Sequence, residues 1–190
     1  HKAFGEDTAL LAGDALLTHA FEIIASSELS DDKKVSDSLL LAQNAGVGGM
    51  IGGQVIDLIY EKENPTVKQL LNVYRMKTGA LISAACLMGC ISAGADEEKM
   101  SAASKFAYSL GIAFQIQDDI LDIVGDEEEL GKPVGSDAEN EKITYAALVG
   151  IEKAKSDVKK LTNAAVNQLD IFENSDFLKA LALSLVNRKK

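Results

Sequence analysis

The sequence predicts an all-α protein, and two observations carry that prediction. Apolar residues recur at three- and four-residue spacing along almost the whole chain, as they do on one face of a helix. Strand signals are nearly absent, because there is no sustained alternation of polar and apolar residues and no Asn-Gly or Asp-Gly hairpin turn. Ala and Leu dominate the composition, which also suits packed helices.

Each expected helix is bounded by residues that start or stop helices. Ser30 to Asp32 can cap the second helix, and Asn64-Pro65-Thr66 ends it and begins the third. Gly94 stops the third helix and Asp96 caps the fourth. An acidic loop is expected over 125–135. The predicted helices cover about 6–27, 32–61, 66–94, 97–124, 139–151, 152–170 and 174–188.

Nothing in the chain marks a domain boundary, so residues 1–190 are expected to form a single domain. With 190 residues, of which 47% are hydrophobic, the chain can bury one good core. Four of the five glycines inside the second predicted helix form pairs spaced four residues apart, and each costs roughly 1 kcal/mol there relative to Ala. Their spacing predicts a closely packed neighbouring helix or ligand; they are Gly48, Gly49, Gly52 and Gly53.

Charge and cysteine content limit the partners and the compartment. The net charge of −10 argues against nucleic acid as a partner, because phosphates would be repelled. A small anionic substrate is compatible with this net charge if metal ions and a few lysines make the local charge of its site positive. Cys86 and Cys90 have no His or further Cys beside them, so buried free thiols are expected. Reduced thiols and the lack of a signal-peptide pattern predict a cytoplasmic protein.

Two uncharged stretches, 39–56 and 78–95, are as long as a membrane span. The first contains amides and five glycines, and the second is mostly Ala, Ser, Gly and Cys. Neither has the Leu and Phe density or the flanking Trp and Tyr of a span. We therefore expect central helices of a bundle and no membrane span.

One helical stretch, 114–122, sets three carboxylates among apolar residues. Asp118 and Asp122 fall on one face, and Asp119 lies one step around the helix. Like charges that close repel one another, so the arrangement favours a bound cation. Oxygen ligands without His or Cys point to Mg²⁺, which takes one or two carboxylates plus substrate phosphates. The alternative is a solvated acidic face, which the apolar flanks disfavour.

Three lysines accompany this stretch. Lys132 lies ten residues after Asp122 in Gly-Lys-Pro-Val-Gly-Ser-Asp, Lys142 lies five after Asp137, and Lys77 lies in Met-Lys-Thr-Gly-Ala. These segments, with Phe-Gln-Ile-Gln-Asp-Asp-Ile-Leu-Asp and Gly-Gly-Gln-Val-Ile-Asp-Leu, resemble the trans-isoprenyl diphosphate synthases. The resemblance is closest to bacterial short-chain farnesyl diphosphate synthases and runs in one order from His1 to about Lys190.

The resemblance implies an isoprenoid (terpenoid) synthase helical bundle around a central cavity. Such enzymes are prenyltransferases that join isopentenyl diphosphate to an allylic diphosphate, dimethylallyl or geranyl, to give farnesyl diphosphate with Mg²⁺. It implies metal binding by Asp118, Asp119 and Asp122, and catalytic roles for Lys77, Thr78, Gln115 and Asp118. The implied substrate-binding residues are Lys77, Thr78, Gln115, Lys132 and Lys142. Asp137 is expected to lie in the outer shell around the metal-binding motif.

The chemistry of these groups agrees with the implied roles. Breaking the bond to diphosphate builds negative charge on the leaving oxygens and positive charge on the allylic carbons. Lysines and Mg²⁺ stabilise the first charge, and the dipoles of Gln115 and Thr78 stabilise the second. Burial of the five carbons of each added C5 unit contributes about 4 kcal/mol of binding free energy. The depth of the cavity can therefore set product length.

The family's first Asp-rich motif and most of its isopentenyl diphosphate site should precede His1 and are missing from this chain. We therefore expect the chain by itself to be inactive, and the intact protein to be a homodimer. Alternatives are a longer-chain (geranylgeranyl or polyprenyl) synthase or a non-catalytic regulatory subunit of the same fold. A terpene cyclase is disfavoured, because Asp118 to Asp122 does not match its usual second motif. Asp14 and His19 are expected to be structural.

Overall fold

The computed structural model describes residues 1–124, 143–186 and 188, and these residues form helices with no strand among them. The prediction of an all-α protein is confirmed. The α-helices are α1 (Glu6–Ser26), α2 (Asp31–Ala45), α3 (Met50–Tyr60), α4 (Val67–Tyr74), α5 (Ala80–Ala93), α6 (Glu97–Val124), α9 (Tyr145–Val149), α10 (Ile151–Gln168) and α11 (Asp176–Val186). A π-helical turn, Arg75–Gly79, joins α4 to α5, and a 3₁₀ turn, Leu169–Ile171, follows α10.

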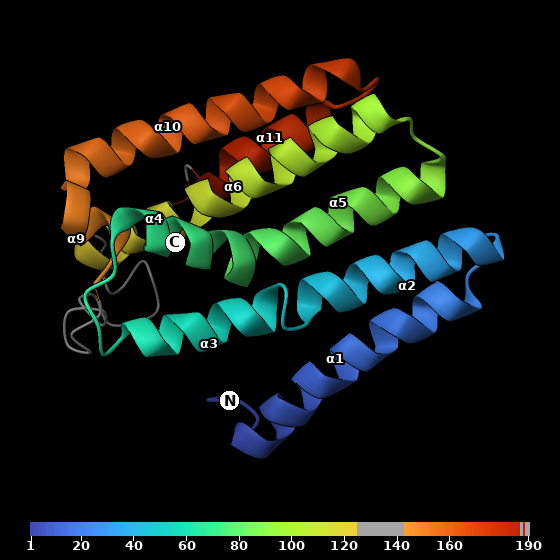
Figure 1. Cartoon of the computed structure of the whole chain (residues 1–190), viewed down its shortest axis with the longest axis horizontal. Coiled ribbons are helices and arrows are strands. Elements are labelled where there is room, and N and C mark those ends of the chain that lie inside the picture. Colours follow the sequence, from blue (N-terminus) through green and yellow to red (C-terminus); the bar gives the residue numbers. More distant parts are fainter. Residues whose placement is uncertain (125–142, 187, 189–190) are drawn as a thin grey trace.

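From α1 to α6 the helices follow one another across the molecule in chain order, with α2 and α3 end to end, and α11 lies between α6 and α10 in the view of Figure 1. Helix α1 packs beside α2, α2 packs on α5, and α5 packs on the 28-residue α6. Helices α10 and α11 cover the other side of α6. Helix α6 therefore runs through the centre of the described fold, and it carries the predicted acidic stretch at its C-terminal end.

The helix ends follow their expected chemistry at three places. Thr66 begins α4 in a capping box: its backbone N–H donates to Gln69 Oε1, and its own Oγ1 accepts from the Gln69 backbone N–H. Gly94 ends α5 in the left-handed region, with φ 69°. Asp96 caps α6, because its Oδ1 accepts from the backbone N–H of Lys99 at 2.8 Å. Ser30 precedes α2 without a side-chain capping bond.

The prediction of one helix over 32–61 is wrong, whereas the helix predicted over 66–94 is confirmed from Val67 to Ala93. The first divides into α2 and α3 at residues 46–49, where Gly49 has φ −132° and ψ −122°. An added Cβ at Gly49 would lie 2.0 Å from the Asn44 carbonyl oxygen, so the glycine permits the break. The second stays helical throughout but takes π-helical geometry at Arg75–Gly79, which the sequence did not predict. Of the helix expected over 139–151, only α9 lies in the described part, where Thr144 caps it.

The core lies around α6 on the side away from α1. Its largest fully buried side chains include Leu70, Val73, Ile116 and Leu169, which come from α4, α6 and the turn after α10. In α1 only Ile24 is buried. The edge made by α1 to α3 exposes large apolar side chains, among them Leu10, Leu16, Val35, Leu39, Val47 and Val55. A single domain over 1–190 remains a prediction.

Three helical stretches are long and apolar enough to cross a membrane by length and composition: Glu6–Ser26, Asp31–Tyr60 and Val67–Ala93. Two of them are irregular: one breaks at residues 46–49, and one contains the π turn. Each of these two also carries a charged residue that pairs inside the bundle, namely Asp57 and Lys77. The absence of a membrane span remains a prediction.

Cys86 and Cys90 are free thiols on α5 and are half-buried rather than buried. Burial raises the pKa of the Cys86 thiol to about 11, with a smaller contribution from Cys90. Because the thiolate is the nucleophile, alkylation of Cys86 by iodoacetamide at pH 8 should be roughly 100-fold slower than that of a free thiol. Mass spectrometry of a timed reaction would measure this rate. Reaction at the rate of glutathione would contradict the burial of the thiol.

Candidate active site

Asp118 is the accessible carboxylate at the end of α6, with a side chain that is 38% exposed. Gln115, one turn earlier, donates from Nε2 to Asp118 Oδ2 at 3.3 Å. Arg188, beyond the end of α11, pairs with Asp118 Oδ1 and lies 3.8 Å over the Phe114 ring. The guanidinium thus neutralises the carboxylate that the acidic stretch leaves most exposed.

Asp119 points into the protein and is 8% exposed. Its Oδ2 accepts from the Tyr74 hydroxyl at 2.6 Å and from the backbone N–H of Tyr145 at 2.9 Å. Burial, together with the charge of Asp119 and this bond, raises the pKa of Tyr74. Asp119 therefore ties α6 to α4 and α9, while Asp118 one residue earlier faces the surface.

We expect Tyr74→Phe to lower the free energy of unfolding by about 1–3 kcal/mol, because a buried carboxylate loses a donor. Tyr108→Phe is the matched control, since the contacts of Tyr108 with Arg75 and Gly79 are made by its ring. Urea titration of both variants and the wild type would measure the difference. Equal stabilities of the two variants would contradict an anchoring role for the Tyr74–Asp119 bond.

Lys77 and Thr78 lie in the π turn, directly after Tyr74. Lys77 Nζ donates to Asp57 Oδ2 at 2.6 Å, and their side chains are 31% and 4% exposed. Asp57, on α3, is thus a buried partner for the lysine. Asp57 is the aspartate of the Gly-Gly-Gln-Val-Ile-Asp-Leu segment that contributes to the family resemblance.

The π turn packs against α6 beside Gly111, four residues before Gln115. The Tyr74–Asp119 bond joins the residue before this turn to the acidic stretch. The fold therefore brings the π turn with Lys77 and Thr78 to the same end of α6 as Gln115 and Asp118. An acidic, amide-bearing helix end beside a lysine-bearing turn can hold a cation and an anionic group together.

The three aspartates do not form a self-contained metal site. Among the described residues there is no group of three or more His, Cys, Asp or Glu side chains that could hold a metal ion. Asp122, like Asp119, is buried, at 3% exposure. Lys132, Asp137 and Lys142 lie outside the described residues. The predicted roles of the three aspartates, and those of Lys132, Asp137 and Lys142, remain predictions.

Arg188 is a site residue that the sequence reasoning missed. It is separated from Asp118 by 70 positions, so no local pattern connects the two. A signal that could have pointed to Arg188 is the local composition. Arg188, Lys189 and Lys190 are consecutive basic residues in a chain whose net charge is −10.

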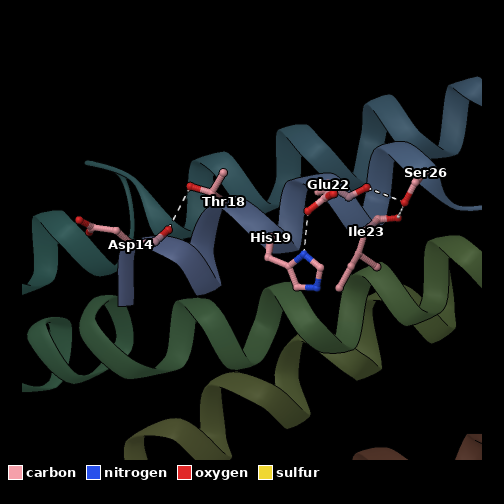
Figure 2. Close-up of polar contacts among 6 residues, drawn as sticks. All are labelled: Asp14, Thr18, His19, Glu22, Ile23 and Ser26. Atoms are coloured by element: carbon pink, nitrogen blue, oxygen red, sulfur yellow. Dashed lines mark hydrogen bonds and ion pairs between the residues drawn. The ribbon is translucent and has the colours of Figure 1, made fainter. Parts of the chain in front are cut away.

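Asp14 and His19 lie on exposed α1 (Figure 2). His19 Nδ1 lies 2.8 Å from Glu22 Oε2, and the Asp14 carbonyl accepts from the Thr18 hydroxyl at 3.0 Å. All four residues belong to one helix, and none of these contacts reaches the α6 site. That Asp14 and His19 are structural remains a prediction.

An apolar cavity of about 870 Å³ lies between α5, the first half of α6 and the segment joining α10 to α11. It is lined among others by Cys86, Gly89, Cys90, Phe106 and Phe172. None of the predicted site residues in the described part of the chain lines it. The predicted site residues in the described part of the chain and this cavity therefore lie in different parts of the fold.

This helical bundle has the all-α fold of the isoprenoid synthases, because solved isoprenyl synthase structures superpose on almost the whole chain. The chain belongs to the polyprenyl synthetase family, whose pattern matches residues 1–182. It is 42% identical to the farnesyl diphosphate synthase of Escherichia coli, over 100% of this chain and 66% of that protein. It is 41% identical to the geranylgeranyl diphosphate synthase of Cyanophora paradoxa, over 99% of this chain and 64% of that protein.

Solved structures show the same fold. The geranyltransferase of Helicobacter pylori, crystallised with magnesium and isoprenyl diphosphate, matches 98% of this chain with a TM-score of 0.80 and 35% identity. The geranylgeranyl pyrophosphate synthetase of Pyrococcus horikoshii matches 99% of it with a TM-score of 0.84 and 30% identity. The chain spans 62% and 69% of these two structures, and about two thirds of the relatives' sequences.

Proposed function

We propose that the whole protein is a prenyltransferase that joins isopentenyl diphosphate to an allylic diphosphate, dimethylallyl or geranyl, head to tail. Mg²⁺ would supply positive charge to the leaving diphosphate. The donor set fits this ion, because Asp118 offers an accessible carboxylate and Mg²⁺ completes its shell with water and substrate phosphates. The Helicobacter pylori structure holds magnesium with an isoprenyl diphosphate.

The remaining steps, which are metal binding, diphosphate binding and stabilisation of the allylic cation, are assigned to residues of this chain. Asp118 would hold the metal, and Lys77 would bind the diphosphate, with its ammonium kept in place by Asp57. The amide of Gln115 and the hydroxyl of Thr78 would direct their oxygens to the developing allylic cation. Arg188 would leave Asp118 when the metal binds, and its positive charge would remain at the mouth of the site. Lys132 and Lys142 are proposed as further diphosphate ligands, and Asp119 and Asp122 as supports of the metal site.

The observation that carries this proposal is the convergence of Asp118, Gln115 and the Lys77 turn at one end of α6. Incubating the whole protein with labelled isopentenyl diphosphate and each allylic primer, with and without Mg²⁺, tests it. We expect chain elongation only with both diphosphates and the metal. No product with any primer would reject the proposal and favour the non-catalytic subunit.

We propose farnesyl diphosphate as the main product, because of the likeness to bacterial short-chain synthases. A geranylgeranyl product is the second candidate, since a geranylgeranyl diphosphate synthase is 41% identical to this chain. Sizing the labelled products by chromatography separates C15 from C20. That the 190 residues alone are inactive, and that the protein is cytoplasmic, remain predictions; free Cys86 and Cys90 fit a reducing compartment.

We further propose that the whole protein is a homodimer that uses the edge made by α1 to α3. Helix α1 buries one residue and contacts the bundle mainly through α2. Large apolar side chains are exposed on these helices, among them Leu10, Leu16 and Val35, and grouped apolar exposure of this kind marks protein–protein contact sites. Sedimentation equilibrium at micromolar concentration should give twice the monomer mass. Leu16→Lys should shift the population to monomer, and a wild-type protein that sediments as monomer would contradict the proposal.

A further inference from the structure

The π turn that carries Lys77 is held by close backbone contacts from two other helices. On α3, an added Cβ at Gly53 would lie 2.4 Å from the Lys77 backbone nitrogen and 2.8 Å from its Cα. On α6, an added Cβ at Gly111 would lie 2.6 Å from the Cα of Gly79. Real Cβ atoms do not approach backbone atoms this closely, so each glycine sets how near its helix lies to the turn.

Side chains fix the same turn along its length. The Tyr74–Asp119 bond holds the residue before it, and the Lys77–Asp57 ion pair holds its middle. Arg75 lies 5.6 Å from the centre of the Tyr108 ring, and Tyr108 in turn packs on Gly79. Contacts from α3 and α6 thus surround a five-residue segment whose π-helical backbone differs from the helices on either side.

A π turn adds a residue to a helical turn and redirects the side chains that follow, which is why such turns recur at functional sites. Here the redirected residues include Lys77 and Thr78. Because Gly53 contacts the backbone of Lys77 itself, any displacement at Gly53 moves the lysine directly. Gly111 contacts the turn two residues later and moves Lys77 less.

We propose that Gly53 and Gly111 are positioning residues that clamp the π turn and so place the Lys77 ammonium for the substrate diphosphate. This inference rests on the proposed function for the role of Lys77. The clamp itself is a property of the fold and can be tested without activity.

The matched set of variants is Gly53→Ala, Gly111→Ala and Gly89→Ala in the whole protein. Gly89 lies on α5 with nothing within 4 Å of an added Cβ, so it controls for the general effect of Ala in a helix. Displacements of about 1 Å can cost on the order of 100-fold in rate. We expect Gly53→Ala to lower kcat/KM for the allylic diphosphate about 10- to 100-fold, Gly111→Ala less, and Gly89→Ala less than threefold.

A double-mutant cycle with Lys77→Ala separates positioning from general structural damage. If Gly53 acts through Lys77, the effect of Gly53→Ala should fall below about threefold once the lysine is absent. An equal loss in both backgrounds, or a Gly53→Ala enzyme within threefold of wild type, would overturn the inference.

A second readout does not depend on catalysis. In protein whose lysines carry ¹³C-methyl groups, the Lys77 signal, assigned by its loss in Lys77→Arg, reports the Asp57 ion pair. It should move in Gly53→Ala and stay in place in Gly89→Ala. If Gly53→Ala does not fold, Gly111→Ala takes its place with a smaller shift. An unmoved signal overturns the clamp, whereas a moved signal in a protein without prenyl transfer rejects the proposed function alone.

Discussion

Asp118→Ala in the whole protein is expected to lower kcat by about 10²–10³-fold and to change the allylic KM much less. Asp118 is the accessible carboxylate of the acidic stretch, and its proposed metal contact matters most as charge builds on the departing diphosphate. Interactions that strengthen in the transition state appear mainly in kcat. Steady-state assays at saturating Mg²⁺ measure both constants.

Two further variants make this test specific. Asp118→Asn keeps the size of the side chain and should still lose most of the rate, because a neutral amide oxygen is a weaker ligand for Mg²⁺. Asp176→Ala removes an exposed carboxylate at the start of α11 and should keep wild-type kinetics. An Asp118→Ala enzyme within threefold of wild type would contradict the proposed metal contact of Asp118.

Ile116→Ala is expected to lower the free energy of unfolding by about 2–5 kcal/mol, because it leaves a cavity in the core. Ile116 lies two residues before Asp118 and is 0% exposed. For a chain of this size the loss corresponds to a fall in Tm of about 5–15 °C. Calorimetry at one fixed protein concentration would measure it.

Ile123→Ala is the matched control, since it removes the same atoms from the same helix. Ile123 is 43% exposed, so its truncation should cost much less than that of Ile116. Equal Tm values for the two variants would contradict the orientation of α6, and with it the outward position of Asp118.

Most of the helices could be predicted from the sequence, because the signals that specify them act locally. Apolar spacing repeats every three to four residues, and a cap such as Thr66 with Gln69 acts across three. The same range places Gln115 beside Asp118, and their contact is a property of one helix turn. The family motifs are likewise short local strings in a fixed order.

The break at residues 46–49 and the π turn at Arg75–Gly79 could not be predicted from local patterns. The sequence of 66–94 reads as one helix, yet the turn at Arg75–Gly79 is π-helical. Its contacts with Gly53 and Gly111 come from α3 and α6, and a local pattern does not contain them. The glycines inside the second predicted helix did indicate a close neighbour, and at Gly53 that neighbour is the backbone of Lys77.

The sequence by itself determined an all-helical protein of this family, and it determined that three carboxylates share one short stretch of helix. Only the tertiary structure decided their different surroundings. Asp119 meets Tyr74 from 45 positions away, and Asp118 meets Arg188 from 70 positions away. Adjacent residues on a helix point about 100° apart, so burial and pairing depend on which distant helix covers each direction.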